Sequence, residues 1–317
     1  MKIVILDGQA VNPGDLSWDC FNQFGQVAVY EHTDDAQVVE RIGDAEIIMT
    51  NKVPITEELF KLCPSIRLVC VLATGYNLVD CEAARRRGIF VCNVPDYGTN
   101  AVAQFTFSLL LELCNRVGFH DDLVHQGEWS RCHNFCFWRT PQTELAGKTL
   151  GIIGFGRIGR AVGRIANAMG MNVLAYNRSR HPEGAAFGQY VDLDVLLARA
   201  DIVSLHCPLT SENIGMINSA SLDKMKDGAI LLNTARGGLL NETDVAHALH
   251  TGKLRGAAVD VVSQEPIVAE NPLLTAPNCI ITPHMAWAPV ESRQRILDCT
   301  VTSIQGFLQG NPIHTVN

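Results

Sequence analysis

The run Leu150-Gly151-Ile152-Ile153-Gly154-Phe155-Gly156-Arg157-Ile158-Gly159-Arg160 decides the fold. Gly154, Gly156 and Gly159 form the pattern G-x-G-x-x-G directly after an apolar stretch that is typical of a buried strand. An amphipathic segment follows, and a second strand is expected at residues 171–176. Because the order is strand, glycine turn, helix and strand, the run predicts a dinucleotide-binding unit rather than a purely structural glycine turn.

The glycines of this loop suit the pyrophosphate of a dinucleotide. They permit a tight turn, keep the approach to the pyrophosphate clear of side chains, and allow close contact between helix and strand. A helix that begins near Arg157 directs N–H groups and its positive dipole end at the same anion. We therefore expect the loop to bind the cofactor through Gly154, Gly156, Arg157, Ile158 and Gly159.

Composition limits the class of protein. The chain has 317 residues, of which 47% are hydrophobic and 18% charged, which is enough for two soluble domains. A net charge of −8 without a long basic block argues against nucleic acid or an anionic membrane as partner. No apolar run is long enough to span a bilayer, and residues 1–7 are typical of a strand rather than a signal peptide. We expect a cytoplasmic protein.

Cysteine usage agrees with a reducing compartment. The 11 cysteines are scattered through apolar runs without a C-x-x-C pair, so reduced thiols are expected. Cys132, His133 and Cys136 have a spacing that fits no common metal site, and we predict no metal.

Short apolar runs alternate with helical patterns in the first part of the chain, which predicts a parallel sheet with crossover helices. The expected strands are residues 2–6, 26–30, 46–50, 67–72 and 89–92, and the expected helices are 38–42, 56–62 and 80–87. Thr74 and Gly75 follow the fourth strand. Because ligands gather at the carboxyl ends of such strands, these two residues are candidate contacts for an anion.

A long segment without proline, residues 99–123, has helical spacing and predicts one helix suited to bridging two domains and acting as a hinge. Residues 127–138, which include Trp129, Phe135 and Trp138, are too aromatic for a solvated loop. We interpret this cluster as a subunit interface and expect a homodimer. Burial inside the same subunit is the alternative.

The alternation of strands and helices resumes after the glycine loop, with strands expected at residues 201–206, 229–233, 256–262 and 279–282. A final helix is expected at residues 291–309. We expect this helix to return to the first domain. The domains are then residues 1–98 plus 287–317, and residues 99–286.

Three charged or titratable residues follow strands of the second domain. These are Arg236, Glu265 and His284. Each by itself has an ordinary interpretation, as an ion-pair partner, a turn residue or a packed histidine. Together they are expected at the rim where a nicotinamide would lie, which is where catalytic groups occur in this kind of sheet.

Five ordered motifs resemble the D-isomer-specific 2-hydroxyacid dehydrogenases over essentially the whole chain. They are the glycine loop, residues 201–210, residues 233–238, Val259-Asp260-Val261 with Glu265-Pro266, and Thr282-Pro283-His284. Leu6-Asp7 and residues 129–138 look most like the glycerate dehydrogenase, or hydroxypyruvate reductase, branch. The resemblance implies an α/β fold of two Rossmann-like parallel-sheet domains with a cleft between them. Residues 1–98 plus 287–317 would be the flavodoxin-like substrate domain, and residues 99–286 the dinucleotide-binding domain.

The chemistry of a 2-oxo acid explains these residue types. A guanidinium offers two parallel donors to the carboxylate, so Arg236 is the candidate clamp, a role the resemblance also assigns, with Thr74 and Gly75 sharing it. Hydride transfer builds negative charge on the carbonyl oxygen, and His284 is the natural proton donor. Glu265 would hold the imidazole in one tautomer and favour its protonated form.

Further cofactor contacts are implied by the resemblance. It places Asp260 against the nicotinamide carboxamide, with capping of a strand end as the alternative. Cys207 and the backbone of Thr234 and Ala235 would line the same trough, whereas we interpret His206 as structural.

Nucleotide choice depends on the run Tyr176-Asn177-Arg178-Ser179-Arg180. NAD-dependent folds usually place Asp or Glu here, to bind the ribose 2′-hydroxyl. Without that carboxylate, Arg178 and Ser179 can bind a 2′-phosphate, which favours NADP(H) over NAD(H). NAD(H) stays open, because Asn177 can accept a ribose hydroxyl.

The activity implied is NAD(P)-dependent interconversion of a small 2-oxo acid and its D-2-hydroxy acid. Hydroxypyruvate with D-glycerate, or glyoxylate with glycolate, are the expected pairs. Two alternatives stay open: a phosphoglycerate-type dehydrogenase without a regulatory domain, and a dinucleotide-sensing, corepressor-like binding protein.

Overall fold

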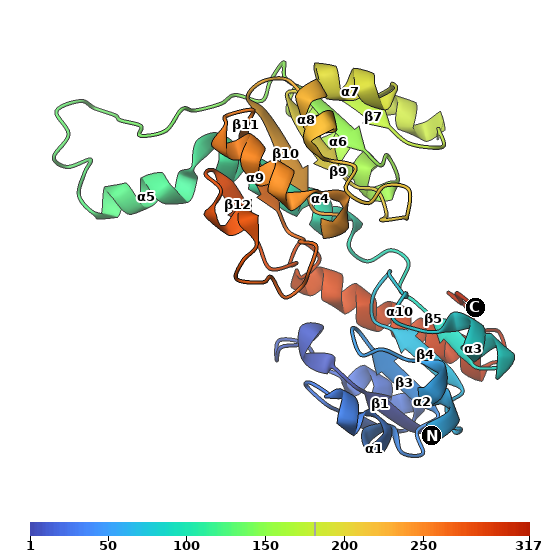
Figure 1. The fold of residues 1–317 in the computed structure, drawn as a ribbon. Helices are drawn as coiled ribbons and strands as arrows, with labels where there is room; N and C mark the ends of the chain where they lie inside the picture. The colour runs from blue at the N-terminus through green and yellow to red at the C-terminus, as the bar shows by residue number, and fades with distance from the viewer. Residues whose placement is uncertain (181) are drawn as a thin grey trace. The chain divides into compact units, whose positions relative to one another are not determined.

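A computed structural model describes residues 1–180 and 182–317 (Figure 1). The chain forms two compact units. The first unit comprises residues 1–98 and 287–317, and the second comprises residues 99–286. Among the helices of the described residues, none has the length and apolar character needed to cross a bilayer.

The first unit is built on a five-stranded parallel sheet in the order β2-β1-β3-β4-β5. The strands are β1 (Lys2–Ile5), β2 (Gln26–Val29), β3 (Ile47–Thr50), β4 (Leu68–Val71) and β5 (Phe90–Cys92). The α-helices are α1 (Val38–Ile42), α2 (Glu57–Leu62), α3 (Cys81–Arg86) and α10 (Val290–Leu308).

Both faces of this sheet are buried, because successive side chains of a strand point to opposite faces. Val4 packs in a core with residues of α1, α2 and α3. Its neighbours Ile3 and Ile5 pack in a second core with α10, which contributes Ile296 and Leu297. The helix at the end of the chain therefore completes the unit that the first strands begin.

The second unit contains a seven-stranded parallel sheet in the order β12-β11-β10-β9-β6-β7-β8. The strands are β6 (Thr149–Ile153), β7 (Asn172–Tyr176), β8 (Gln189–Tyr190), β9 (Ile202–Leu205), β10 (Ala229–Asn233), β11 (Leu254–Val259) and β12 (Cys279–Ile281). The α-helices are α4 (Thr99–Asn115), α5 (Val117–His125), α6 (Arg157–Ala168), α7 (Leu193–Arg199), α8 (Ser219–Lys224) and α9 (Glu242–His250). Helices α4 and α6 cover one face, and α7, α8 and α9 the other.

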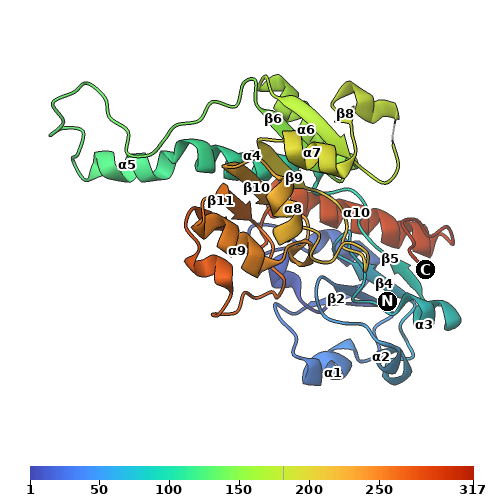
Figure 2. The ribbon, with the colours of Figure 1, turned by 45° about the horizontal axis from the view of Figure 1, so that its top comes forward.

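The expectation of one helix over residues 99–123 is wrong. The helix ends at Asn115, and Arg116 adopts a left-handed conformation, with φ of 49°, before α5 begins. The Arg116 guanidinium donates to the side-chain oxygen of Asn278 at 2.9 Å, a tertiary contact that helical spacing does not reveal. Helix α5 and the long loop after it project from the body of the second unit, as Figures 1 and 2 both show.

A buried carboxylate joins two strand ends of the first unit. Asp7 follows β1, is 7% exposed, and accepts hydrogen bonds from the backbone N–H groups of Asn51, Lys52 and Val53, which follow β3. The Asn51 side chain in turn donates to the carbonyl of Leu72, at 2.8 Å, just beyond β4. This network positions the loops at the carboxyl edge of the sheet.

The variant Asp7→Asn tests the network. Burial raises the pKa of Asp7 above the ordinary range of an aspartate, so the folded protein binds this proton more tightly than the unfolded chain. The contribution of Asp7 to the free energy of unfolding is therefore largest below the unfolded-state pKa, and it falls as pH rises through the folded-state pKa. Asparagine turns an N–H toward backbone donors, and we expect a loss of about 1–3 kcal/mol.

Urea unfolding of wild type and D7N, at a series of pH values from acid to neutral, checks both points. The stability advantage of the wild type should be largest at the acidic end and should shrink toward neutrality. An advantage that grows with pH would contradict the assignment.

Candidate active site

The glycine loop between β6 and α6 is shaped to receive a phosphate. Gly154 has φ of +95°, and a Cβ there would lie 2.4 Å from the amide nitrogen of Cys207. A Cβ on Gly159 would lie 2.2 Å from the carbonyl oxygen of Gly154, so α6 packs directly on the loop. By contrast, a Cβ on Gly156 would meet nothing within 4 Å. The open side of the loop is therefore at Gly156, the N-cap of α6, where the positive end of a helix favours an anion.

Sheet topology places this loop at a switch point. From β6 the chain adds β7 and β8 on one side, and then returns to pair β9 with β6 on the other side. In such sheets a crevice opens at the carboxyl ends of the two central strands, and dinucleotides bind there. Gly154 follows β6 and Cys207 follows β9, and their backbones are in contact at this switch point. The residues present therefore fit a dinucleotide.

The residues after β7 form a small polar turn. Asn177 accepts a hydrogen bond from the N–H of Phe155, at 3.2 Å, and donates to the carbonyl of Ser179, at 2.7 Å. Its amide therefore holds the end of β7 against the glycine loop. Arg178 is exposed and pairs with Glu212, with 3.6 Å between Nη1 and Oε2. Because exposed ion pairs contribute little free energy, this guanidinium can exchange Glu212 for another anion.

Two of the residues predicted to contact the cofactor beyond β9 and β10, Thr234 and Ala235, already form hydrogen bonds within the chain. The N–H of Ala235 donates to the Asn233 side chain at 3.1 Å, and the hydroxyl of Thr234 lies 3.0 Å from that of Thr106. Burial raises the pKa of the Cys207 thiol, which is therefore protonated near neutrality. Burial also lowers the pKa of His206 to about 3, so this imidazole is neutral. Cofactor contacts by Cys207, Thr234 and Ala235 stay predictions.

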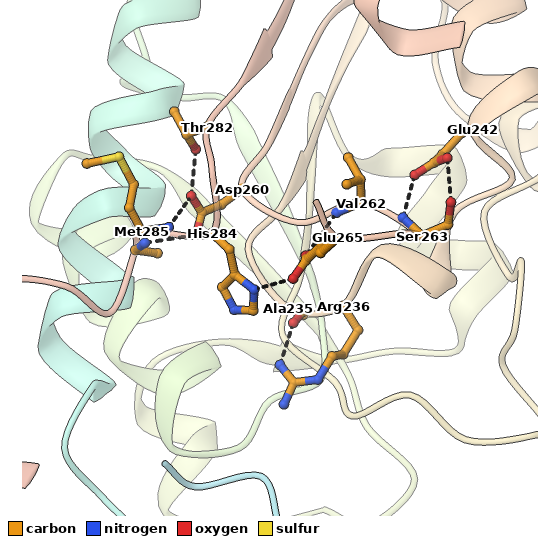
Figure 3. Close-up of polar contacts among 11 residues, drawn as sticks. Ala235, Arg236, Glu242, Asp260, Val262, Ser263, Glu265, Thr282, His284 and Met285 are labelled. Carbon is orange, nitrogen blue, oxygen red and sulfur yellow. Dashed lines mark hydrogen bonds and ion pairs between the residues drawn. The ribbon is translucent and has the colours of Figure 1, made fainter. Parts of the chain in front are cut away.

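His284 and Glu265 are in direct contact. The Nδ1 atom of His284 lies 2.6 Å from Oε2 of Glu265, and both side chains are about one-third exposed. The other carboxylate oxygen, Oε1, accepts from the N–H of Val262 at 3.2 Å. The two residues follow β11 and β12 in the chain, and Figure 3 shows their side chains in contact. A carboxylate bonded to Nδ1 orients the ring and directs Nε2 away from itself.

Arg236 follows β10, the neighbour of β11 in the sheet. Its Nη1 donates to the carbonyl of Ala235 at 2.7 Å. Figure 3 shows the guanidinium below the His284–Glu265 pair, pointing toward the same region. Guanidinium, imidazole and carboxylate thus come from the ends of three consecutive strands of one sheet.

Asp260 holds the chain on both sides of His284. Its side chain is 1% exposed, and Oδ1 accepts from the hydroxyl of Thr282 (2.6 Å) and the N–H of Met285 (2.9 Å). Oδ2 accepts from the N–H of Ala286 at 2.8 Å. Between these anchors His284 adopts φ of 53°, a conformation that non-glycine residues rarely take and that the surrounding structure must impose. A contact of Asp260 with a carboxamide stays a prediction.

Thr74 and Gly75 lie beyond β4 in the first unit. The hydroxyl of Thr74 donates to the carbonyl of Val94 at 2.7 Å, and its own carbonyl accepts from the Asn93 side chain at 2.8 Å. The loop is therefore held in a defined conformation. Substrate binding by its N–H groups stays a prediction.

Sequence reasoning missed the supporting residues of the site. Thr282 and Glu242 make short hydrogen bonds to residues near His284 and Glu265, and Asn51 supports the loop at Thr74. A carboxylate in the first turn of a helix, as at Glu242, usually indicates interaction with the helix dipole. The position of Glu242 in the sequence therefore does not indicate a role in the site. In the described residues, His, Cys, Asp and Glu form no group suited to hold a metal ion.

Comparison with known proteins gives consistent matches. Residues 107–286 match the D-isomer specific 2-hydroxyacid dehydrogenase, NAD binding domain. The chain is 51% identical to a hydroxypyruvate reductase of Blautia hydrogenotrophica over 100% of both chains. It is 39% identical to a glycerate dehydrogenase of Methylorubrum extorquens, over 99% of this chain and 98% of that one. The structure of an acyclic imino acid reductase in complex with NADPH and D-arginine superposes with a TM-score of 0.86, at 28% identity and over 100% of both chains.

The contrast between Gly156 and Gly154 predicts the outcome of two substitutions. In Gly156→Val the side chain enters open space, so the melting temperature should be unchanged, while the approach to the pyrophosphate is blocked. We expect the Kd for NADH and NADPH to rise about tenfold or more. A tenfold rise corresponds to a loss of about 1.4 kcal/mol of binding free energy. In Gly154→Ala the new methyl group meets backbone, and the melting temperature should fall. Fluorescence titration and thermal unfolding measure both effects, and wild-type cofactor affinity in G156V would show that this loop does not hold the dinucleotide.

Proposed function

This chain belongs to the D-isomer specific 2-hydroxyacid dehydrogenase family, and we propose that it reduces hydroxypyruvate to D-glycerate, with glyoxylate as a second substrate. It is an NAD(P)-dependent oxidoreductase that interconverts a small 2-oxo acid and the corresponding D-2-hydroxy acid. The observation that carries the proposal is the 2.6 Å contact between His284 and Glu265. The 51% identity to a hydroxypyruvate reductase over the whole chain supports the choice of substrate.

In this proposal His284 is the catalytic acid. A reduced nicotinamide nucleotide held at the glycine loop by Gly154, Gly156 and Gly159 would supply the hydride for the carbonyl carbon of the substrate. As negative charge develops on the carbonyl oxygen, Nε2 of protonated His284 donates the proton that completes the hydroxyl group. Glu265 keeps the imidazole oriented and stabilises its cationic form through the bond to Nδ1. In the oxidative direction, neutral His284 accepts the proton from the hydroxyl group.

Arg236 binds the substrate carboxylate. A guanidinium presents two parallel N–H donors, which fit the two oxygens of a carboxylate, and one more donor can polarise the adjacent carbonyl. The bond from Nη1 to the carbonyl of Ala235 limits the orientations of the group. Backbone N–H groups at Thr74 and Gly75 share the carboxylate.

We further propose NADP(H) as the preferred cofactor. Asn177 stands where a carboxylate would repel a 2′-phosphate, and its side chain is bonded to the glycine loop and to the Ser179 carbonyl. The exposed Arg178 has only a weak surface ion pair with Glu212 to give up. A 2′-phosphate carries more charge than Glu212 and offers more acceptor oxygens.

The assembly we propose is a homodimer built through the projecting segment of α5 and the following loop. Six apolar side chains there are exposed, up to 90% at Phe135, namely Val117, Phe119, Val124, Trp129, Phe135 and Trp138. Apolar exposure on this scale is costly unless another surface covers it, and aromatic residues are enriched in interfaces. In sedimentation experiments the wild type should be a dimer. Phe135→Asp should dissociate into monomers at protein concentrations at which the wild type is still dimeric. A monomeric wild type would overturn this assembly.

A panel of 2-oxo acids with both cofactors tests the proposed activity. NADPH absorbance should fall fastest with hydroxypyruvate and more slowly with glyoxylate. It should fall slowest with 3-phosphohydroxypyruvate, because the phosphate of that acid has no assigned partner in the site. The NADPH to NADH ratio of kcat/KM tests the cofactor separately. Absence of turnover with every acid would favour the alternative of a dinucleotide-sensing binding protein. Preference for the phosphorylated acid would favour the phosphoglycerate-type alternative.

The substitution Glu265→Gln tests the proton donor. Glutamine can still accept the bond from Nδ1, but it no longer stabilises the imidazolium by charge. The alkaline limb of the reductive pH profile should therefore move to lower pH, and kcat near neutrality should fall about tenfold or more. Glu270→Gln, which removes a carboxylate from the exposed end of the same loop, serves as the control. An unshifted limb in E265Q would reject the pairing as the source of the effect.

A further inference from the structure

The loop that carries Glu265 has both ends bonded to one carboxylate. Glu242 Oε1 accepts from the backbone N–H of Ser263, and Oε2 accepts from the Ser263 hydroxyl, both at 2.7 Å (Figure 3). Oε2 also accepts from the side-chain amide of Asn271 at 2.9 Å. Ser263 precedes Glu265 and Asn271 ends the loop, so Glu242 joins the two points between which the loop extends.

Glu242 is a rigid anchor. It is the first residue of α9, whose Val245 and Leu249 are buried in the core of the second unit. The N-terminal end of a helix stabilises a carboxylate, and an ionised acceptor forms stronger hydrogen bonds than a neutral one. On the other side, Asn271 is 5% exposed and accepts from the N–H of Leu273 at 3.0 Å. The loop is thus connected to two buried segments through one side chain.

Residues 262–263, which Glu242 holds through Ser263, also support the proposed catalytic pair of His284 and Glu265. The N–H of Val262, directly before Ser263, donates to Oε1 of Glu265. A Cβ on Gly237 would lie 1.9 Å from the carbonyl carbon of Val262, so the residue after Arg236 packs against the same peptide. A shift of residues 262–263 would therefore move Glu265 relative to His284, and would also disturb the turn that carries Arg236.

We propose that Glu242 is a positioning residue for the His284–Glu265 pair, acting through Ser263. This rests on the catalytic roles proposed above. Glu242 does not touch substrate or cofactor in this scheme. Its carboxylate sets the position of the 262–263 backbone, that backbone sets the Glu265 carboxylate, and Glu265 orients and charges the imidazole. Small displacements of a catalytic group cost large factors in rate, so the effect should appear in turnover.

Glu242→Gln is the direct test. The glutamine amide presents N–H donors where the wild type accepts three hydrogen bonds, so the segment can no longer be held in the same way. We expect kcat for hydroxypyruvate to fall about tenfold and the alkaline limb of the pH profile to move to lower pH, as in E265Q. The Kd for NADPH should stay as in the wild type. Ser263→Ala removes only the hydroxyl bond and should give a smaller change in the same direction, which keeps the test available if E242Q folds poorly.

The matched control is Asp244→Asn. Asp244 lies in the same first turn of α9 and accepts from the backbone N–H of Ser219 at 2.8 Å, so it makes the same kind of bond to a different segment. D244N should resemble E242Q in melting temperature but keep the wild-type pH profile and kcat. If D244N and E242Q change the pH profile equally, or if neither changes it, the role of Glu242 is only structural and the proposal fails.

The double variant E242Q/E265Q separates this proposal from the one it rests on. If Glu242 acts through Glu265, the double variant should lose about as much kcat as E265Q alone, because the lost interaction is the same. Multiplied losses would overturn the proposal. If E265Q and H284N both retain wild-type activity, the catalytic roles proposed for Glu265 and His284 are wrong. That outcome does not depend on any Glu242 variant, so it is distinguishable from failure of the Glu242 proposal.

Discussion

Parallel pairing of the strands is the constraint on which the rest of the structure depends. Because all neighbouring strands of both sheets run in one direction, every strand of a sheet ends at the same edge. In the second unit this edge receives the glycine loop after β6, Arg236 after β10, Glu265 beyond β11 and His284 beyond β12. An antiparallel strand among these would send one of the groups to the opposite edge.

Buried carboxylates organise the loops at the carboxyl edge of each sheet. Asp7 joins the ends of β1 and β3 in the first unit, and Asp260 holds the segment on both sides of His284 in the second. Each is almost fully buried, and each accepts hydrogen bonds mainly from backbone N–H groups. A buried carboxylate is costly unless such donors surround it, so these residues specify one loop conformation rather than merely tolerating it. In our proposal Glu242 does the same for the loop of Glu265.

Local patterns predicted the regular elements well, since apolar periodicity and glycine positions are properties of short segments. Helix α1 and strand β10 have the expected bounds, and the other strands foreseen differ by a few residues at their ends. The helical spacing of residues 99–123 does not reveal the break at Arg116, where the backbone is left-handed and the side chain bonds to Asn278, far away in the chain. The structure adds that the N–H of Ala235 and the side-chain hydroxyl of Thr234 already form hydrogen bonds within the chain, while cofactor contacts by the backbone of these two residues stay predictions.

By itself, the sequence determined the family, and it predicted the glycine loop as the dinucleotide site and Glu265 and His284 as the candidates for acid–base chemistry. These follow from side-chain type and order along the chain. Only the tertiary structure decided which groups meet: Glu265 contacts His284 across 19 positions, Asn271 reaches Glu242 across 29, and Asp7 binds Asn51 across 44. Such contacts depend on strand order and loop conformation, which arise from packing of the whole sheet and leave no local pattern in the amino-acid sequence.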